Sequence, residues 1–320
     1  MDARAFGARG DGLTLDTRAL QAAIDAAALQ GGELLLPPGT YLTGALFLKS
    51  GMTLRLAAGA TLRGSQDLAD YPLLPTRVAG IEMRWPAALV NIYGEHDVRL
   101  VGDGCIDGDG QVFWDRYWQL RAAYEPRGLR WAADYDAHRP RLVQVFESAR
   151  VHIGDGLLLR RSGFWTLHLC YSEDVTVEQL TVRNNDEARG PSTDGIDIDS
   201  CRRVRIRHAD IAVNDDALVL KAGRDADGLR VARPSEDIDI SDCVVREGGW
   251  VGQPATACSS AGLGGWARIE MLTATQTEKR PAGPAPGRHA APRRTAPRPA
   301  VQAQRPWPRR RPQRPRTARG

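Results

Sequence analysis

The sequence predicts an all-β fold, a right-handed parallel β-helix whose N-terminal end is covered by a helix. Three observations support this prediction. Strand-like segments recur every 22 to 34 residues beyond residue 142, no helical pattern of ten residues separates them, and one amphipathic helix precedes them. A turn of a β-helix takes roughly 20 to 30 residues, which lies within solenoid periods, and the absence of intervening helices argues against βαβ units. A β-sandwich is the alternative, but it would not give repeats in the same register.

The predicted helix covers the run RALQAAIDAAALQ. Asp16 and Thr17 cap its start, and Gly31 with Gly32 ends it. Its apolar face carries Leu20, Ile24, Ala27 and Ala28. We expect this helix to cover the open end of the solenoid.

Short strands follow at Glu33–Leu36, Tyr41–Leu48 and Met52–Leu56, with a turn at Pro37-Pro38-Gly39. From residue 142 the strands form two interleaved series. One reads LVQVF, TLHL, IDID and LVLK, and the other reads VHIGDGLLL, VTVEQLTV, VRIRHADIAV and IDISDCVV. Apolar and polar residues alternate in each unit, as strands require. The pattern predicts two strands per coil.

Residues 105–140 are less regular and rich in aromatic residues and arginine. We expect a long loop over one face of the solenoid. Exposed aromatic rings beside an acidic site commonly stack on sugars, and packing of the rings beneath the loop is the alternative. The aromatic residues are Trp114, Tyr117, Trp118, Tyr124, Trp131 and Tyr135.

Three acids form the candidate active site. Asp194 stands 21 positions before Asp215, and Asp216 follows directly. Residues one coil apart stack, so we expect the three carboxyls to lie side by side and at least one pKa to be raised. An acid with a raised pKa beside ionised carboxylates suits the hydrolysis of a glycosidic bond. Two adjacent acids can share the site only where the strand begins or bulges.

Residues 5–250 resemble the polygalacturonase family of glycoside hydrolases (family 28), especially its bacterial exo-acting and rhamnogalacturonan-type members. The resemblance rests on FGARGDGLTLDTRALQAAID, on NIYGEHDVRLVGDGCIDGDGQVFW, and on the acid motifs STDGIDIDS and NDDALVLKAGRDADG. It implies inverting hydrolysis of α-1,4-galacturonide links in pectin or its oligomers, without a cofactor or metal ion.

The same resemblance implies roles for the three acids. Asp215 would donate a proton to the leaving oxygen, while Asp194 and Asp216 would hold and deprotonate the attacking water. An inverting site needs its carboxyl groups roughly 6.5–9.5 Å apart, and we expect neighbouring coils to supply about this gap.

Other polar residues lie near these motifs. His168 matches a family position one coil before Asp194 and is a candidate substrate ligand, with a place in the coil wall as the alternative. Lys221 is a second candidate, which would meet an acidic sugar or form an ion pair. Asp197 and Asp199 are expected to face solvent.

The chain departs from the family pattern in two places. Ser192 stands where the family usually has Asn, and its hydroxyl can still bond nearby backbone. After CVVREG the family continues with Gly-His-Gly and later Arg-x-Lys, but neither motif occurs here. The histidine would help to set the protonation of the acids and the basic pair would grip the substrate carboxylate, so we expect impaired activity.

The sequence therefore divides into a β-helix domain at 1–248, incomplete at its C-terminal end, and a low-complexity tail at 249–320. Residues 281–320 hold 10 Pro and 11 Arg, a composition that cannot bury a core. We expect this tail to be disordered. A loss of reading frame near residue 249 is our hypothesis for its origin, and a basic tail that binds nucleic acid or an acidic surface is the rival.

Composition limits the remaining possibilities. Without its basic tail the chain carries a net charge of −7 over residues 1–280. Five cysteines are too few and too scattered for a disulfide scaffold or a zinc site, and no run of 18 apolar residues suggests a membrane span.

We expect a monomer that acts on pectic polysaccharide or galacturonide oligomers and binds no nucleic acid. The chain as written carries no signal peptide and is expected in the cytoplasm, or in the periplasm or medium if the true start lies upstream. A pectate lyase-like enzyme and a non-catalytic β-helix are the alternative functions.

Overall fold

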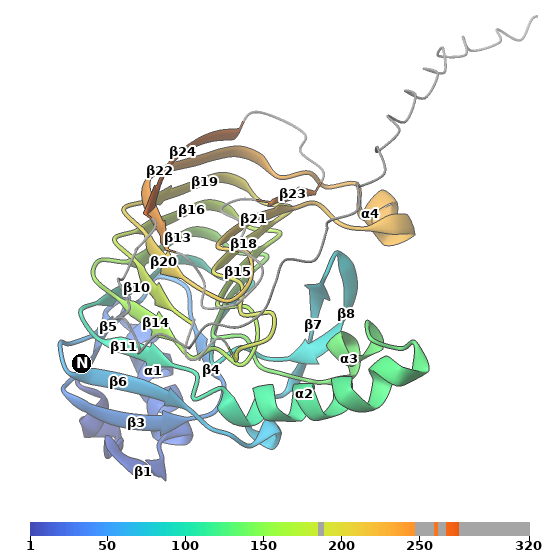
Figure 1. Cartoon of the computed structure of the whole chain (residues 1–320). Coiled ribbons are helices and arrows are strands. Elements are labelled where there is room, and N and C mark those ends of the chain that lie inside the picture. Colours follow the sequence, from blue (N-terminus) through green and yellow to red (C-terminus); the bar gives the residue numbers. More distant parts are fainter. Residues whose placement is uncertain (185–188, 247–258, 262–266, 275–320) are drawn as a thin grey trace, which may run out of the picture. The chain divides into compact units, whose positions relative to one another are not determined.

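Parallel strands stacked coil upon coil form the body of the protein (Figure 1). The computed structural model describes residues 1–184, 189–246, 259–261 and 267–274, all within the unit Met1–Thr277. Strands of successive coils pair in parallel, and the hairpin of β7 (Leu73–Val78) and β8 (Ile81–Pro86) is antiparallel. The predicted parallel β-helix is confirmed.

Each coil contributes a strand to each of three walls. The first wall contains β2 (Glu33–Leu36), β5 (Thr53–Leu56), β10 (His96–Gly102), β13 (Ala149–Gly154), β16 (Glu173–Glu178), β19 (Arg202–Arg207) and the first part of β22 (Glu236–Arg246). The second contains β1 (Asp11–Leu15), β3 (Gly39–Thr43), β6 (Ala60–Gly64), β11 (Cys105–Asp107), β14 (Leu158–Arg160), β17 (Thr181–Arg183), β20 (Asp210–Ala212) and the last part of β22. The third contains β4 (Leu46–Leu48), β9 (Val90–Tyr93), β12 (Val143–Phe146), β15 (Leu167–Cys170), β18 (Ile196–Asp199), β21 (Leu218–Lys221) and β23 (Ser259–Ala261).

The expectation of two strands per coil is wrong, because each long unit of the second predicted series turns a corner. Asp155, Gln179 and His208 occupy the left-handed region, with φ of 55°, 51° and 52°, between a first-wall and a second-wall strand. Such a residue redirects the chain without breaking the alternation of apolar residues. A single periodic unit in the sequence is thus two strands in space.

A second set of left-handed residues recurs at one register of the first wall. Asp97, Arg150, Asp174, Arg203 and Asp237 all have φ between 53° and 57°. Their charges alternate from coil to coil, and Arg150 with Asp97 and Arg203 with Asp174 form two-pronged ion pairs. These exposed pairs help to hold the register between coils at a small energetic gain per pair.

The core is the interior of the coils. Inward side chains of the third wall, such as Val143, Leu167, Ile196 and Leu218, follow one another across paired strands and are fully buried. Each such side chain contributes about 1.5–3 kcal/mol when removed from water. The cysteines Cys170, Cys201 and Cys243 are buried and free.

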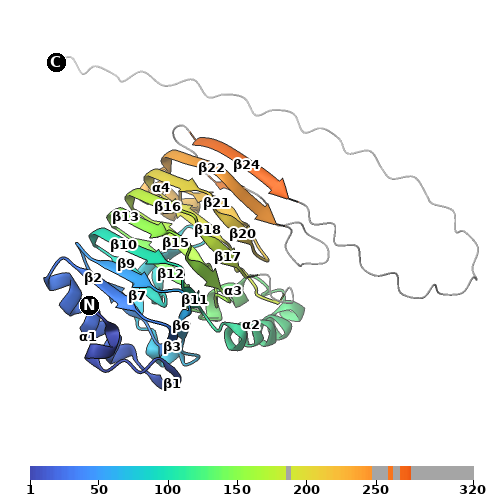
Figure 2. The same ribbon diagram turned by 90° about the vertical axis from the view of Figure 1, so that its left-hand side faces the viewer.

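The N-terminal helix α1 (Thr17–Leu29) lies at the end of the stack opposite β22 and β24 (Ala267–Ala274) (Figure 2). It buries Leu20, Ala23, Ile24 and Ala27, as expected for a helix that covers apolar coil ends. Asp16 occupies the N-cap position, but its carboxylate accepts hydrogen bonds from the amides of Arg9 and Gly10 instead of capping α1. Short 3₁₀ turns lie at Ala3–Phe6 and Leu68–Asp70.

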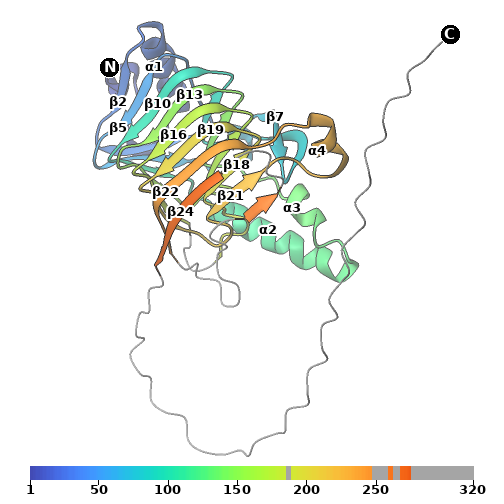
Figure 3. The same ribbon diagram turned by 90° about the horizontal axis from the view of Figure 1, so that it is seen from above.

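Three insertions project on the side of the third wall (Figures 1 and 3). They are the hairpin of β7 (Leu73–Val78) and β8 (Ile81–Pro86), the segment with α2 (Gln111–Tyr124), a 3₁₀ turn (Glu125–Arg127) and α3 (Ala132–Asp136), and the helix α4 (Asp225–Val231). The expectation of a long loop at 105–140 is therefore wrong. The apolar residues of α2 do not form a regular stripe, so no helical period marks this segment in the sequence. Trp114 and Tyr117 are buried, whereas Trp131 is 71% exposed.

Strands also occur beyond residue 249, contrary to expectation. β23 pairs with β21, and β24 (Ala267–Ala274) pairs with β22. The predicted disorder of the tail at 249–320 otherwise falls on residues that lie outside the described part of the chain. Within the described part of the chain, no helix is both long and apolar enough to cross a membrane.

Candidate functional site

The three predicted acids meet at the edge of the third wall. Asp194 lies two residues before β18, and Asp215 and Asp216 lie just before β21. One carboxylate oxygen from each residue lies within 4.8 Å of the others. Asp194 is 5% exposed, Asp215 is exposed, and Asp216 is intermediate. The acids therefore form a cluster that is open on one side and buried on the other.

Backbone hydrogen bonds between coils bring these acids together. The amide of Thr166 donates to the carbonyl of Asp194 at 2.9 Å, and the amide of Gly195 donates to the carbonyl of Asp216 at 2.9 Å. Adjacent coils are separated by only about 4.7–4.9 Å, the spacing of paired strands. For this reason the expected gap of 6.5–9.5 Å is wrong for the nearest oxygens.

Asp215 and Asp216 lie outside the regular alternation of the strand. The amide of Asp216 donates to Oδ1 of Asp215 at 3.0 Å, and the side chain of Asn214 donates to the carbonyl of Asn184 at 3.0 Å. Both acids precede Leu218, the first residue of β21. This irregular start lets two adjacent carboxyls reach the same cluster.

The cluster holds protons strongly. Partial desolvation, followed by the negative charges of Asp194 and Asp216, raises the pKa of Asp215 to about 7. Although solvent reaches Asp215, protein surrounds the rest of its carboxyl. Burial and the neighbouring Asp197 raise the pKa of Asp194 well above its usual range, and Lys221 opposes this rise. An acid poised near neutral pH beside further carboxyls is an arrangement for proton transfer.

Lys221 lies behind the acids and not on an open surface. Its Nζ contacts Oδ1 of Asp197, lies 3.5 Å from Oδ2 of Asp194, and lies 3.5 Å from the ring centroid of Trp165. Its side chain is 16% exposed. Burial lowers the pKa of Lys221, but Asp197 and Asp194 outweigh this effect and raise it, so the ammonium stays charged.

The expectation that Asp197 and Asp199 face solvent is wrong. Both are fully buried, because the hairpin β7–β8 packs on the outer face of the third wall. Arg77 on β7 donates to Oδ1 of Asp199 at 2.9 Å. Thr76, also on β7, accepts a hydrogen bond from Gln144 of β12 at 2.7 Å. Alternation identified the outward positions, but not the hairpin that covers them.

His168 is also fully buried in this wall, and it does not line an open cleft. Its Nε2 lies 3.8 Å from Oδ2 of Asp199, and neither ring nitrogen has a hydrogen-bond partner. Burial, and then the positive charge of Arg141, lowers the pKa of His168 to about 3. A neutral histidine with no access to solvent fits a structural place beneath the hairpin.

Besides Arg77, two further arginines that the sequence pattern did not identify are buried near the acids. Arg139 donates to the carbonyl of Pro191 at 2.7 Å, and Arg141 donates to the carbonyl of Arg77 at 2.7 Å. Burial lowers the pKa of Arg139 and of Arg141 to about 10, so both remain charged near neutral pH. Arg139 and Arg141 flank Pro140 just before β12, two coils before β18. Their position in the coil repeat, next to a strand of the wall that carries the acids, was the sequence feature that could have identified them.

A second group of potential metal ligands lies beneath the hairpin. Donor atoms of His168, Cys170 and Asp199 lie within 4.8 Å of one another. Such a mixed donor set suits zinc-like ions, but the guanidinium of Arg77 already pairs with Asp199, and that of Arg141 interacts with His168. These two cations oppose the binding of a further cation.

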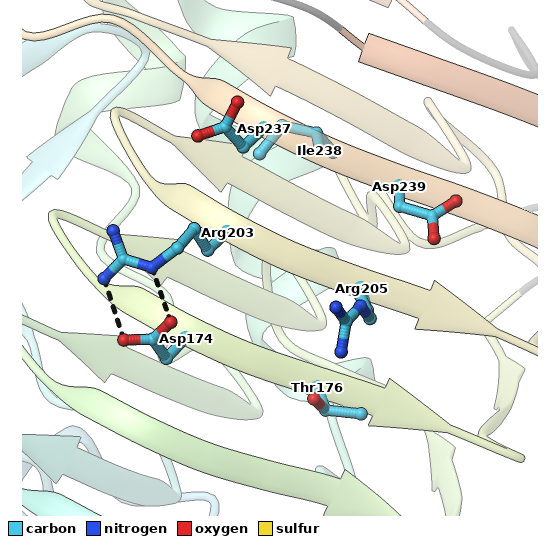
Figure 4. A pocket seen from close by; sticks show the side chains of 7 residues that line it. All are labelled: Asp174, Thr176, Arg203, Arg205, Asp237, Ile238 and Asp239. Atoms are coloured by element: carbon cyan, nitrogen blue, oxygen red, sulfur yellow. Dashed lines mark hydrogen bonds and ion pairs between the residues drawn. The ribbon is translucent and has the colours of Figure 1, made fainter.

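A hollow of about 450 Å³ lies elsewhere, on the outer face of β16, β19 and β22 in the first wall (Figure 4). Asp174 and Arg203 pair across it, and Arg205 lies beside Thr176. None of the three acids lines it. The chemistry of the acid cluster therefore does not involve this hollow.

Two family models and several relatives match the chain. The model of glycosyl hydrolases family 28 matches residues 33–248, and that of rhamnogalacturonase A/epimerase, pectate lyase-like, matches residues 1–60. A probable polygalacturonase of Vitis vinifera is 33% identical over 245 residues, which are 73% of this chain and 47% of the relative. An exo-poly-alpha-D-galacturonosidase of Dickeya chrysanthemi is 28% identical over 280 residues, 76% of this chain and 45% of the relative.

Solved structures show the same fold. The hyperthermoactive exopolygalacturonase of Thermotoga maritima superposes with a TM-score of 0.71 at 27% identity, over 86% of this chain and 68% of that one. The family 28 exopolygalacturonase of Yersinia enterocolitica gives a TM-score of 0.71 at 24% identity, over 85% and 53%. The chain spans about half the length of the curated relatives it matches.

Proposed function

Since the chain belongs to glycosyl hydrolase family 28, we propose that it hydrolyses α-1,4-galacturonide links in pectin or its oligomers. The observation that carries this proposal is the convergence of Asp194, Asp215 and Asp216 within 4.8 Å at the edge of the third wall. Three carboxyls with different exposure supply a proton donor and a water-binding pair, which is the minimum that glycoside hydrolysis needs.

In this mechanism Asp215 is the general acid. Its raised pKa of about 7 keeps it protonated at mildly acidic pH, and its exposure lets it reach the glycosidic oxygen of a bound chain. Asp194 and Asp216 face it from the neighbouring positions and hold the attacking water. Asp194 is too buried to reach a sugar carbon itself, so water is the nucleophile in our proposal.

A water nucleophile leads to inversion at the anomeric carbon. The short distance between the acid oxygens is nearer to the roughly 5–5.5 Å of retaining sites, so the stereochemical outcome is a direct test. Proton NMR of the first product from trigalacturonate should show the β-anomer. Initial release of the α-anomer would exclude the water mechanism.

We propose further that attack occurs at a chain end. The hairpin β7–β8 covers the outer face of the third wall as far as β18, and its tip contacts the segment that begins α4. The amide of Arg224 donates to the carbonyl of Gly80 at 3.0 Å, and Arg230 pairs with Glu82 at 2.6 Å. A polymer bound across the acid cluster would meet this hairpin at one of its ends. Chain-end attack predicts monomer or dimer as the first products, with a slow fall in the viscosity of polygalacturonate.

We expect the activity to be low compared with that of an intact relative, because the Gly-His-Gly and Arg-x-Lys motifs do not occur in the sequence. Without the histidine the acids lack one partner for their protons, and without the basic pair the substrate carboxylate loses a ligand. Reducing-sugar release from polygalacturonate, measured beside an intact relative, tests this expectation. Equal turnover numbers would contradict it.

The acid cluster also has the oxygen ligands that a calcium-dependent lyase would use. A lyase of this kind gives an unsaturated product that absorbs in the ultraviolet. The enzyme itself loses activity when a chelator removes calcium. Incubation with polygalacturonate, with and without EDTA, separates the two reactions. We expect reducing ends without ultraviolet absorbance, and no effect of EDTA. A non-catalytic β-helix would give neither product.

A further inference from the structure

We propose that Lys221 is a positioning residue that favours the ionised form of the Asp194 carboxyl and holds it in place to activate water, and that it does not bind substrate. The proposal rests on the proposed function, because it assigns Asp194 the role of base. It replaces the expectation from the sequence that Lys221 meets an acidic sugar.

The first argument is that partners from the protein surround the ammonium of Lys221 on three sides. An ammonium carries three hydrogens, and three partners surround Nζ: Oδ1 of Asp197, Oδ2 of Asp194 at 3.5 Å, and the face of the Trp165 ring at 3.5 Å. Trp165 is 4% exposed and closes the side of Nζ that faces it. A sugar carboxylate could approach only by displacing one of these partners.

The second argument is that Asp194 needs a cation to act as a base. Asp194 is 5% exposed, and its carboxyl lies close to Asp197 and Asp216, so both burial and like charge favour its neutral form. A protonated Asp194 cannot accept a proton from water. Lys221 is within ion-pair distance of this carboxyl and opposes both effects.

The third argument concerns how Lys221 is held. Lys221 lies opposite Asp199 in the pairing of β18 with β21, but its side chain reaches back to Asp197 and Asp194. The fully buried Asp197 therefore anchors Nζ between itself and the base. Other charged or titratable groups also interact with this cluster: Asp199 on β18, His168 on β15, Arg139 and Arg141 before β12, and Asp215 and Asp216 before β21.

Lys221→Met tests the proposal, with Lys221→Arg as the conservative variant and Lys49→Met as the matched control. Lys49 is a half-exposed lysine on the surface that pairs with Glu95 at 3.6 Å. We expect Lys221→Met to lower kcat on trigalacturonate at least tenfold with an unchanged KM. The acidic limb of its pH profile should move up by about one unit or more, because Asp194 then ionises only at higher pH. Lys221→Arg should restore part of kcat, and Lys49→Met should behave as wild type.

A raised KM with an unmoved acidic limb would show a substrate ligand and overturn the proposal. Equal loss at every pH without recovery in Lys221→Arg would show a purely structural lysine, and would also overturn it.

The role of Lys221 can also be tested by a measurement that does not require hydrolysis. A negative result for Lys221 is then distinguishable from a failure of the proposed function. The protein is labelled with ¹³C at aspartate Cγ, and the Asp194 resonance is assigned with Asp194→Asn. Its titration midpoint should rise in Lys221→Met and not in Lys49→Met. An unchanged midpoint overturns the role of Lys221 even in an active enzyme. A raised midpoint without hydrolysis in any variant supports the electrostatic role and places the failure in the proposed function.

Discussion

The amide of Gly195 donates a hydrogen bond to the carbonyl oxygen of Asp216 in the next coil, at 2.9 Å. This bond fixes the position of Asp194, the residue before Gly195, relative to the acids of the following coil. The backbones approach so closely here that a Cβ at position 195 would lie 2.3 Å from the carbonyl oxygen of Ala217 and 2.9 Å from Ile211. The spacing of the acid cluster therefore depends on a residue without a side chain.

Gly195→Ala should separate the coils at the acid cluster. Overpacking of this kind costs about 1–3 kcal/mol of unfolding free energy, and displacement of Asp194 should reduce hydrolysis further. Urea denaturation and turnover of trigalacturonate measure the two effects. Gly32→Ala is the control, because its nearest atom lies 3.8 Å from the added Cβ and its φ is not positive. Equal behaviour of the two variants would contradict the close approach.

Asp215→Asn should remove the general acid and leave the fold intact, since Asp215 is exposed. We expect hydrolysis to fall by about 10²–10⁴-fold, the usual contribution of general acid catalysis. In the wild type the reaction needs the protonated form, so activity should decline as pH rises through about 7. The pH profile of kcat measures this limb, and a wild-type rate that still climbs above pH 8 would speak against Asp215 as the acid.

The same residue predicts a pH dependence of stability. The pKa of Asp215 is about 7 in the folded protein and near 3.8 when unfolded, so between these values the folded state binds the extra proton. Its contribution to stability is complete below about pH 4 and is lost as pH rises through 7. Thermal melting from pH 4 to 8 should show a smaller decline in Asp215→Asn than in the wild type. Identical slopes would count against the raised pKa.

His168→Leu should make the protein less sensitive to acid. The pKa of His168 is lowered from 6.5 to about 3, so the unfolded state binds a proton that the folded state does not. Stability from this group is present above about pH 6.5 and is lost as pH falls toward 3. Urea denaturation at pH 4 and 7 measures the difference. A variant with a raised KM and unchanged acid sensitivity would instead indicate a substrate ligand.

Ser192→Asn should stabilise the protein. Ser192 has φ of +51°, in the left-handed region that Asn tolerates better than Ser. We expect a gain of about 0.5–1 kcal/mol in unfolding free energy. This is part of the strain energy that a non-glycine residue in the left-handed region usually costs. Differential scanning calorimetry measures it, with Ser192→Ala as the comparison. A lower melting temperature for Ser192→Asn than for Ser192→Ala would show that the serine hydroxyl matters more than the backbone.

The repeat of the chain was enough to predict that the acids meet. Alternating apolar residues identify the strands, and coil steps of 24, 29 and 22 residues align Val143, Leu167, Ile196 and Leu218. Stacking of this kind is local and periodic, because each strand bonds only to its neighbours. The sequence by itself therefore determined the fold class and the meeting of Asp194 with the acids near residue 215.

Only the tertiary structure decided which outward residues are exposed. Asp197, Asp199 and His168 occupy the same outward positions of the third wall that solvated residues would take, yet all three are buried. They are covered by the hairpin β7–β8, in which Arg77 lies 122 positions from its partner Asp199. The insertion docks through contacts that no periodic pattern encodes. Burial, and with it the pKa of each group and the role of Lys221, follows from that docking and not from the repeat.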